Sequence, residues 1–515
     1  MMNDMLVYDW IAENARRFPD KIATIDIHSG RNHSYAAMHE RVARIAGHLS
    51  AIGVAKGDRV GLLSMNSSDM LDIMFACWRI GAVLTMLNFR LTAHELAFMV
   101  SDSGASAVFY DTDLEAVIPA LREKTDVAHW ITMDPAGKGG DLEAAIAAAT
   151  PVYDQLPQLG SDLCMIMYSS GTTGTPKGVM FNHAQFLFIN AGSGGISNAS
   201  NQMVGLVALP LFHIGGLVAY TTISFGFGGT VVVVRAFEPG AMLRLFGDPD
   251  MGVTHFLGVP AMYNAMQAHP DFATTDFSRT QTMSCGAESV PESLLRTWFA
   301  RGVPIREGYG MTETCAAALM QEARDIPGKI GAAGKPVRHC EAKIMRGDGT
   351  EAPVGELGEI WMRGLNITPG YWNRPDANAS SFVDGWFRSG DVGRQDEEGY
   401  FYIEDRVKDM YITGGENVYP AEVENALYAM EAIHEVAVIG LPDPKWGECG
   451  CAVVVPRPGA SVTIEDIKAY CGERLARYKH PARLEIVDAL PRNATGKVLK
   501  FELRERFGGA PQPIG

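Results

Sequence analysis

The sequence contains few cysteines, and their arrangement suggests neither a disulfide framework nor a zinc site. Eight cysteines are spread over 515 residues, and none of them forms a Cys-x-x-Cys pair. Most of them lie in apolar contexts, so we expect reduced and buried thiols in a cytosolic protein. The first residues, Met-Met-Asn-Asp-Met-Leu, lack a basic segment followed by an apolar core. We therefore expect no signal peptide and a cytoplasmic location.

Positively charged residues are fewer than negatively charged ones. The chain has 44 Lys and Arg residues against 60 Asp and Glu residues, which gives a formal net charge of −16. This balance argues against non-specific binding to nucleic acids and against docking on anionic membranes. A phosphate ligand would have to be held by backbone amides and a few well-placed cations. The length predicts two or more domains.

Charged side chains are absent between Lys177 and Arg235. Hydropathy alone would suggest a membrane span around residues 204–234. Pro210 and several glycines interrupt this region, however, and the run 231–234 is β-branched and typical of a strand. We interpret the region as core strands and helices beside a ligand pocket, with no membrane span.

The first part of the chain alternates between strand and helix patterns. Residues 59–64, 82–87 and 106–110 read as strands, and residues 69–80 read as a helix. Such alternation indicates a layered α/β fold with largely parallel sheets. The glycine- and alanine-rich residues 136–150 are interpreted as a surface connection.

Residues 167–178, Met-Tyr-Ser-Ser-Gly-Thr-Thr-Gly-Thr-Pro-Lys-Gly, follow an apolar strand-like run. Glycines let successive backbone N–H groups surround an anion, hydroxyl groups add donors, and Lys177 supplies a full positive charge. The common phosphate-binding loop does not match, because Pro176 stands where its second glycine would be. A flexible surface linker is the alternative. The candidate phosphate-binding residues are Ser169, Ser170, Gly171, Thr172, Thr173, Gly174, Thr175 and Lys177.

A second polar motif, Glu-Gly-Tyr-Gly-Met-Thr-Glu-Thr, spans residues 307–314. Its flanking glycines leave the ring of Tyr309 free to stack on a planar base, and Thr312 offers a hydroxyl to a phosphate oxygen. Glu313 is a hard oxygen ligand suited to Mg²⁺, which binds one or two carboxylates together with phosphate oxygens. A turn with an exposed charge is the alternative.

Three weaker signals accompany these motifs. Small residues around Gly286 would let a flat ring lie against the backbone, although a plain strand-to-helix turn explains them equally well. His213, in Pro-Leu-Phe-His-Ile-Gly-Gly, suggests a bent element lining a cavity, but a lone histidine is more often packed in a core. Asp391 follows a glycine turn and could accept hydrogen bonds from both hydroxyls of a ribose.

Taken in order over roughly residues 10–507, the motifs resemble those of the adenylate-forming superfamily, which includes acyl- and aryl-CoA synthetases, adenylation domains and luciferases. The residues themselves indicate a protein that binds a nucleotide, magnesium and an anionic partner. The resemblance implies a large domain of layered α/β sheets with a small β-barrel-like subdomain, residues 1–406. It further implies a small mobile α+β C-terminal domain, residues 407–515.

The resemblance also implies the reaction. A carboxylic acid and ATP would give an acyl-AMP and pyrophosphate, and coenzyme A would then give acyl-CoA and AMP. In this scheme Lys497, Thr312, Glu313 and His213 are catalytic, and Glu313 holds Mg²⁺. Beyond the phosphate loop, the nucleotide would contact Gly286, Ala287, Glu288, Glu307, Gly308, Tyr309, Gly310, Met311, Thr312, Asp391, Arg406 and Lys497. Glu288 departs from the family, where proline or alanine is commoner.

The C-terminal domain would serve the second step. By resemblance, Gly414 and Gly415 line the tunnel for the pantetheine arm of coenzyme A, and Lys408 is the hinge between domain orientations. From residue 468 to residue 506 there are ten Lys or Arg against five acidic residues. This basic face is a candidate for the phosphates of coenzyme A, and a solvated surface of mixed charge is the alternative.

The candidate acyl pocket is formed by Phe212, His213, Val259, Cys285, Gly308 and Ala316. No Lys or Arg lies in the stretches that supply it, which disfavours a dicarboxylate. The patterns around residues 258–263 and 414–420 resemble bacterial feruloyl- and fatty-acyl-CoA synthetases. We therefore expect an aromatic acid of the cinnamate or ferulate type, with a medium- or long-chain fatty acid as the alternative.

Two other classes of protein remain open: a stand-alone enzyme that loads a carrier protein, and a non-catalytic nucleotide-binding regulator. The chain ends soon after the small domain with no carrier segment, and Lys497 is present, so we rank both below a CoA ligase. A homodimer is left open.

Overall fold

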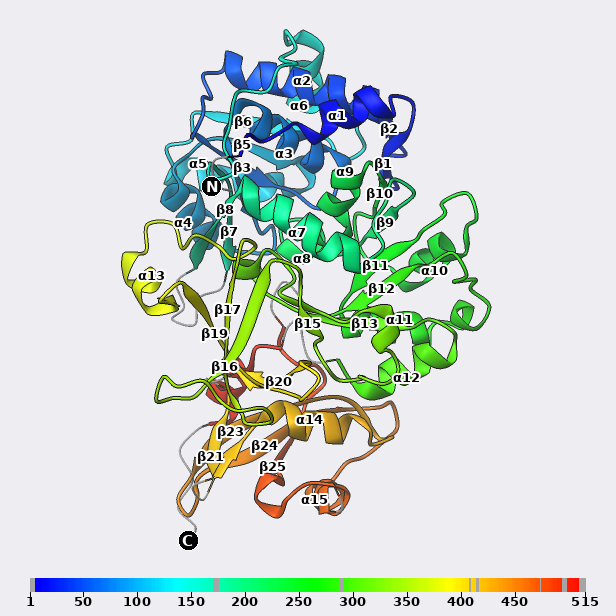
Figure 1. The fold of residues 1–515 in the computed structure, drawn as a ribbon, viewed down its shortest axis with the longest axis vertical. Helices are drawn as coiled ribbons and strands as arrows, with labels where there is room; N and C mark the ends of the chain where they lie inside the picture. Colours follow the sequence, from blue (N-terminus) through cyan, green and yellow to red (C-terminus); the bar gives the residue numbers. More distant parts are fainter. Residues whose placement is uncertain are drawn as a thin grey trace.

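The computed structural model describes residues 5–169, 176–287, 290–406, 409–413, 416–472, 474–492 and 498–508, and for Asp405, Arg406 and Asn417 it describes only the backbone. Figure 1 shows a large N-terminal part, residues 5–406, above a smaller C-terminal part, residues 409–508. Three sheets make up the N-terminal part and a fourth sheet the C-terminal part. The predicted domain boundary falls between β20 and β21, at residues outside the described ranges, and stays a prediction.

The first sheet has six strands and supplies the strand before the candidate phosphate loop. All of its neighbouring strands are parallel except β7 and β8, which form an antiparallel pair. Its strand order is β6 (His129–Met133), β5 (Ala105–Asp111), β3 (Arg59–Leu63), β4 (Val83–Leu87), β7 (Leu163–Ser169) and β8 (Lys177–Asn182). The predicted α/β fold with largely parallel sheets is therefore confirmed.

The second sheet has nine strands and a parallel centre with antiparallel edges. Its order is β15 (Lys335–Pro336), β14 (Leu319–Met320), β13 (Ile305–Tyr309), β12 (Thr282–Cys285), β11 (His255–Gly258), β9 (Val204–Val207), β10 (Thr230–Val233), β1 (Ile22–Asp26) and β2 (Asn32–Ser34). In open α/β sheets, ligands bind outside the carboxyl ends of such parallel strands. The ends of β11, β12 and β13 carry several of the candidate site residues.

The third sheet is antiparallel and corresponds to the predicted β-barrel-like subdomain. It contains β16 (Cys340–Met345), β17 (Gly358–Gly364), β19 (Trp386–Gln395), β18 (Phe382–Val383) and β20 (Phe401–Arg406). The C-terminal sheet contains β22 (Glu416–Val418), β21 (Tyr411–Thr413), β24 (Gly447–Pro456), β23 (Ile433–Asp443) and β25 (Arg483–Ile486). The C-terminal sheet has its own hydrophobic core, as an independently folded unit requires.

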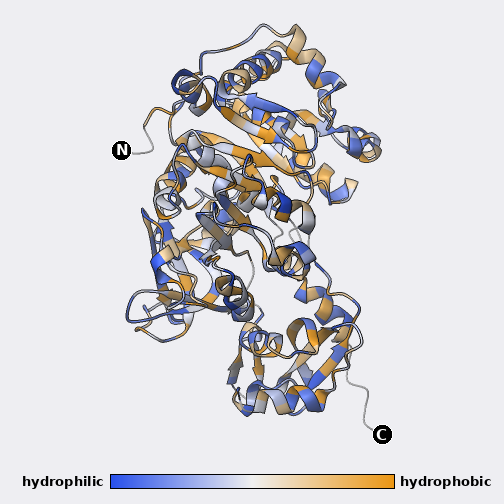
Figure 2. Cartoon of the chain, turned by 90° about the vertical axis from the view of Figure 1, so that its right-hand side faces the viewer, coloured by the Kyte–Doolittle hydropathy of each residue, from blue (hydrophilic) through white to orange (hydrophobic). Residues whose placement is uncertain are grey.

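Helices cover the sheets, and the helix α3 lies deepest. Every residue of α3 is buried, and α3 contacts β1 of the second sheet as well as β4 of the first. Figure 2 shows hydrophobic strands inside the N-terminal part and helices with hydrophilic faces around them. The described helices are α1 (Trp10–Arg17), α2 (Tyr35–Ala51), α3 (Ser68–Ile80), α4 (Ala93–Ser103), α5 (Ile118–Lys124), α6 (Gly140–Ala148), α7 (His183–Ile196), α8 (Ile214–Leu217), α9 (Ile223–Phe227), α10 (Pro239–Gly247), α11 (Pro260–Ala268), α12 (Glu292–Ala300), α13 (Pro375–Ser381), α14 (Pro420–Tyr428), α15 (Ile464–Gly472) and α16 (Lys500–Phe507).

The charge-free region forms core elements, as predicted. It contains β8, α7, β9, three short helical segments and β10. In the ranges that the structure describes, no helix combines the length and the apolar character that crossing a membrane requires. All eight cysteines are buried and none forms a disulfide, in agreement with the expected reduced thiols.

One expectation about the fold is wrong. Residues 136–150 are not a simple surface connection, because Gly140–Ala148 form the helix α6. The glycines precede this helix, while its interior is rich in alanine, the strongest helix former. Asp141 and Glu143 lie in its first turn, where negative charge is favourable next to the helix dipole.

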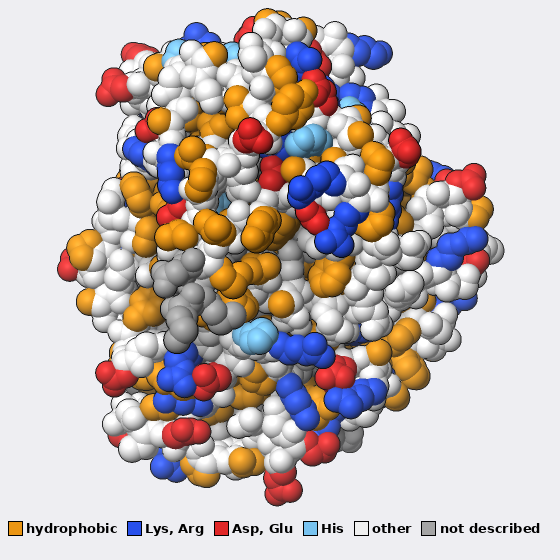
Figure 3. Space-filling model, turned by 45° about the horizontal axis from the view of Figure 1, so that its top comes forward, with side chains coloured by type: hydrophobic (Ala, Val, Ile, Leu, Met, Phe, Trp, Pro, Cys, Tyr) orange, Lys and Arg blue, Asp and Glu red, His pale blue; other side chains and the backbone are white. Residues whose placement is uncertain are grey.

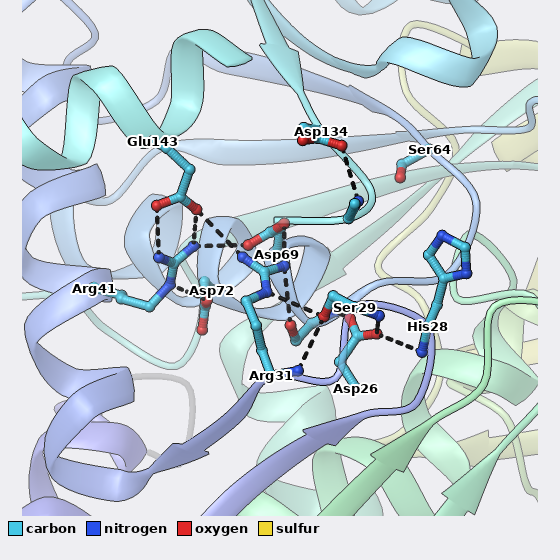
Figure 4. Close-up of polar contacts among 12 residues, drawn as sticks. Asp26, His28, Ser29, Arg31, Arg41, Ser64, Asp69, Asp72, Asp134 and Glu143 are labelled. Carbon is cyan, nitrogen blue, oxygen red and sulfur yellow. Dashed lines mark hydrogen bonds and ion pairs between the residues drawn. The ribbon is translucent and has the colours of Figure 1, made fainter. Parts of the chain in front are cut away.

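A buried charge cluster joins α6 to its neighbours (Figure 4). We call the set of Arg31, Arg41, Asp69, Asp72 and Glu143 the closed cluster. Asp69 lies 2.6 Å from Arg31 and 2.8 Å from Arg41, and Asp72 lies 3.0 Å from Arg41. Glu143 lies 2.9 Å from Arg41. Since these residues come from the β1–β2 loop, α2, α3 and α6, the cluster connects segments that are distant in the sequence.

Charges of both signs are mixed on the surface. On the face shown in Figure 3, Lys and Arg side chains are interspersed with Asp and Glu, and hydrophobic side chains gather near the centre. The acidic surplus therefore does not form a surface of one sign on this face.

Candidate active site

The carboxyl ends of β12 and β13 form the floor of the candidate site. The two strands are parallel neighbours, with Cys285 opposite Glu307. Gly286 and Gly308 therefore emerge at the same edge of the sheet. A Cβ atom on Gly286 would lie 2.8 Å from the carbonyl oxygen of Gly308, which is too close for any side chain. The floor is thus made of backbone at this point, and the packing of a flat ligand against it stays a prediction.

Tyr309 and Asp391 are joined directly. The Tyr309 hydroxyl donates a hydrogen bond of 2.7 Å to Oδ2 of Asp391. Asp391 lies on β19 of the third sheet and is only 4% exposed, and its backbone is paired with Arg406 of β20. The candidate base-stacking residue and the candidate ribose-binding carboxylate therefore lie together, although they come from different sheets.

Glu313 and Lys177 are brought to the same aromatic side chain, that of Tyr371. The Tyr371 hydroxyl donates a hydrogen bond of 2.9 Å to Oε1 of Glu313. The Nζ atom of Lys177 lies 5.2 Å from the centre of the same ring, within cation–π distance. Burial and the nearby Glu313 carboxylate raise the pKa of Tyr371 above its usual value, so its hydroxyl keeps its proton.

The short segment Thr368–Trp372 places Tyr371 between these two groups. Its backbone forms hydrogen bonds with two other parts of the chain. Toward the second motif, the Thr368 N–H donates to the Glu313 carbonyl at 2.7 Å. Toward β8, the Trp372 N–H donates to the Gly178 carbonyl at 2.7 Å, and the Gly370 carbonyl accepts from Met180 at 3.0 Å. The segment thus ties the end of the phosphate loop to Glu313.

The backbone around the second motif adopts uncommon conformations. Cys315 has a φ of 53° and Ala316 has a φ of 80°. Ala287, a candidate nucleotide-binding residue, has a φ of 71°. Positive φ is rare for residues other than glycine and recurs at functional sites. A Cβ atom on Gly310 would overlap with the Ala316 carbonyl, since the two would be 1.6 Å apart. Gly310 therefore permits the tight turn that follows Tyr309.

Glu307 is buried, unlike residues 308–313, which follow it in the motif and are half-buried. Its carboxyl group accepts a hydrogen bond of 2.6 Å from the Gly331 N–H, and its backbone N–H donates to Gln321 at 2.9 Å. Burial raises the pKa of Glu307 to about 8, and the Gly331 hydrogen bond opposes this shift. The side chain therefore holds the loop around Gly331. Its predicted contact with the nucleotide stays a prediction.

The acyl-pocket candidates come from two hydrophobic cores. Phe212 belongs to the core around α3, with Ala316 packed against it, whereas Cys285 belongs to the core around β11 and β12. Val259 directly follows β11. His213 packs on Phe212 with ring centres 4.5 Å apart. Nε2 of His213 is buried and has no hydrogen-bond partner among the described residues. Burial and the nearby Arg90 lower the pKa of His213 to about 4, so the imidazole is neutral at pH 7.

The remaining predicted residues fall into two groups. Ser169 ends β7 and is paired with Lys177 of β8, while Met311 and Thr312 lie at the start of the short 3-10 turn that carries Glu313. The residues that lie outside the described ranges are Ser170, Gly171, Thr172, Thr173, Gly174, Thr175, Glu288, Lys408, Gly414, Gly415 and Lys497. For Arg406, the structure describes only the backbone.

The donor set fits a magnesium ion that is shared with phosphate. In the part of the chain that the structure describes, no group of three His, Cys, Asp or Glu residues could hold a metal by itself. Mg²⁺ is usually held by one or two carboxylates plus substrate phosphates, and not by an all-protein cage. The single oriented carboxylate of Glu313 matches that requirement.

The predicted basic face of the C-terminal part is partly neutralised. Lys479 pairs with Glu422 at 2.6 Å, Lys500 with Glu424 at 2.9 Å, and Arg492 with Glu435 at 3.2 Å. These acids precede residue 468 in the sequence, so the count over residues 468–506 leaves them out. The excess positive charge that is available to a ligand is therefore smaller than that count suggests.

Sequence reasoning missed Tyr371. Its partner Glu313 is 58 residues away, so no local pattern connects them. The available signal was the run Gly370-Tyr371-Trp372, in which two aromatic residues follow a glycine. Such a run marks a close backbone contact, but it does not identify the partner.

Comparisons with known proteins cover both parts of the chain. Residues 11–372 match the family model described as AMP-binding enzyme, and residues 422–497 match the AMP-binding enzyme C-terminal domain. A feruloyl-CoA synthase from Amycolatopsis is 41% identical over 97% of this chain and 98% of its own. A long-chain-fatty-acid–CoA ligase from Mycobacterium tuberculosis is 37% identical over 92% of this chain and 93% of its own.

The arrangement of the whole chain is also found in a solved structure. The crystal structure of ATP-bound MatB from Rhodopseudomonas palustris is 32% identical, with a TM-score of 0.91 over 97% of this chain and 99% of that chain. Its likeness extends over all four sheets, since the match covers nearly the full length of both proteins. The chain belongs to the family of AMP-binding enzymes.

Proposed function

We propose that the protein is an ATP-dependent carboxylate–CoA ligase that works through an acyl-AMP. The observation that carries this proposal is the convergence of the two strongest motifs on one segment, because Tyr371 contacts both Glu313 and Lys177. The Tyr309–Asp391 pair supplies a platform for a base and a ribose. The names of the relatives, among them a feruloyl-CoA synthase, agree with this reaction.

The first step activates the acid. A carboxylate is a poor electrophile at neutral pH, because its charge repels nucleophiles and it has no good leaving group. Its attack on the α-phosphate of ATP gives a mixed anhydride and releases pyrophosphate. Mg²⁺ beside Glu313 would neutralise charge on the phosphates. Lys177 would attract the phosphates, Thr312 would donate a hydrogen bond to one of them, and Lys497 would stabilise the charge that develops at the α-phosphate.

The second step transfers the acyl group to a thiol, and AMP leaves. We infer that coenzyme A enters along Gly414 and Gly415, where the absence of side chains leaves room for the pantetheine arm. Lys408 would act as the hinge about which the C-terminal part rotates between the two steps. This rotation would move Lys497 away from the active site and bring the tunnel to it. The excess positive charge of the C-terminal part would attract the phosphates of coenzyme A.

An aromatic acid of the cinnamate or ferulate type is the favoured substrate. His213 is neutral at pH 7 and would not hold a second carboxylate, which disfavours dicarboxylates. The small residues around Ala316 leave space for a ring. A medium- or long-chain fatty acid is the alternative, in keeping with the relative from Mycobacterium tuberculosis.

A pyrophosphate-release screen tests the proposal. Purified protein is given ATP, Mg²⁺ and a panel of cinnamates, benzoates, fatty acids and dicarboxylates, each without thiol, with coenzyme A or with a phosphopantetheinyl carrier protein. We expect the greatest release with a cinnamate and acceleration by coenzyme A. Acceleration by the carrier alone would indicate a carrier-loading enzyme, and ATP binding without release under any acid would indicate a regulator.

A further inference from the structure

We propose that Tyr371 is a positioning residue that fixes the carboxylate of Glu313 for a magnesium–nucleotide complex. This inference rests on the proposed function, and it assigns a role to a residue that lies outside both polar motifs. Tyr371 is 6% exposed, so its ring is held by packing while its hydroxyl reaches Glu313.

Both ends of Glu313 are held from the same segment. The Tyr371 hydroxyl binds Oε1 of the side chain, and the Thr368 N–H binds the backbone carbonyl. Thr368 is itself anchored, because its hydroxyl donates to the Met180 carbonyl at 2.8 Å. A glutamate side chain in a half-exposed turn has several rotamers available to it. These contacts select one orientation before any ligand arrives.

The orientation of the Glu313 carboxylate is important for binding magnesium. The ion demands near-ideal octahedral geometry and releases its waters reluctantly, so a single protein carboxylate must be well placed. Groups that hydrogen-bond to metal ligands typically change metal affinity 10- to 100-fold when they are removed. With Oε1 occupied by Tyr371, the direction in which the rest of the carboxylate faces is fixed.

The ring of Tyr371 has a second contact, with Lys177. The ammonium group lies 5.2 Å from the ring centre, while the hydroxyl at the far end of the ring binds the carboxylate. One side chain therefore positions a cation and an anion that serve the same phosphate chain. Loss of the hydroxyl alone should affect only the Glu313 side of this arrangement.

The substitution Tyr371→Phe isolates the hydroxyl, because it keeps the ring beside Lys177. We expect the Mg²⁺ concentration for half-maximal pyrophosphate release to rise about tenfold, with an unchanged KM for the acid. Calorimetric titration should also show weaker enhancement of ATP binding by Mn²⁺, a readout that requires no turnover. Tyr400→Phe is the matched control, since the Tyr400 hydroxyl donates to Asp325 at 2.7 Å in a buried pair elsewhere in the N-terminal part.

The outcomes separate this inference from the proposed function. Unchanged metal dependence in Tyr371→Phe, in both assays, would overturn the positioning role, as would an equal change in Tyr400→Phe. If the parent protein releases no pyrophosphate with any acid, the ligase proposal fails, but the Mn²⁺-dependent binding of ATP still tests Tyr371. Tyr371→Leu removes the ring as well, and it should weaken ATP binding in the absence of metal, which Tyr371→Phe should not do.

Discussion

The closed cluster and the candidate active site use the same chemical groups in opposite ways. In the closed cluster, the side chain of Asp69 is 3% exposed and faces two arginines that are 15% and 13% exposed. In the candidate site, Glu313 and Lys177 are half-buried and are held by the uncharged side chain of Tyr371. Charges that neutralise one another inside the protein depend on one another, because loss of one leaves its partners buried and uncompensated. Charges that are oriented by neutral groups at an accessible edge keep their electrostatic potential for a ligand.

The most severe loss of stability should follow Asp69→Ala in the closed cluster. It would remove the buried carboxylate that pairs with both Arg31 and Arg41, and breaking such a buried pair costs about 3–5 kcal/mol in the free energy of unfolding. Denaturant titration measures this loss. Glu143→Ala, in the same cluster but with 30% of its side chain exposed, should cost much less. An equal cost for both variants would show that burial does not decide the role of these charges.

Glu313→Gln should have the converse effect. The amide keeps an oxygen for the Tyr371 hydroxyl but loses the charge, so the rate of acyl-AMP formation should fall about 100- to 1000-fold, or about 3–4 kcal/mol in activation free energy. Pyrophosphate release in a single turnover measures it. The free energy of unfolding should stay within about 0.5 kcal/mol of the parent value, as expected for a half-exposed position. A large loss of stability would place Glu313 with the closed cluster.

Tyr309→Phe should weaken nucleotide binding moderately. It keeps the ring for stacking but removes the hydrogen bond to Asp391. Without this bond the Asp391 carboxylate, which would bind the ribose, is less well oriented, so the Kd for AMP should rise about tenfold, or about 1.4 kcal/mol. Isothermal calorimetry with AMP measures the change. Tyr153→Phe, which removes an exposed hydrogen bond to Glu40, should leave the Kd unaltered.

The smallest effect concerns pH. Because burial raises the pKa of Glu307 to about 8, the folded protein retains a proton there that the unfolded chain has already lost above pH 5. Stability therefore falls as pH rises through 8, by about 1 kcal/mol between pH 7 and pH 8. Denaturant titrations at the two pH values measure it. Glu307→Gln should remove this part of the pH dependence, and an unchanged slope would contradict the assignment.

Much of the candidate site could be predicted from single stretches of sequence. Lys177, Tyr309, Glu313 and Asp391 all lie in glycine-rich polar runs near strand patterns, and these runs read as ligand-binding turns. Tyr371 could not be predicted, since its role depends on two partners from other elements. The helix α6 was missed because the glycines before Gly140 suggested a connection, although the alanines after it favour a helix.

The sequence by itself determined the layered α/β class, the order of the polar motifs and the kinds of groups that they offer. These are local properties, because glycine, hydroxyl and lysine side chains act through the loop that carries them. Only the tertiary structure decided that Arg31 and Asp69 neutralise each other in the interior while Lys177 and Glu313 share an aromatic side chain at an accessible edge. The physical reason is that the energy of a charge depends on its burial and on the distance to its partners, and both are set by segments that meet only in the folded chain.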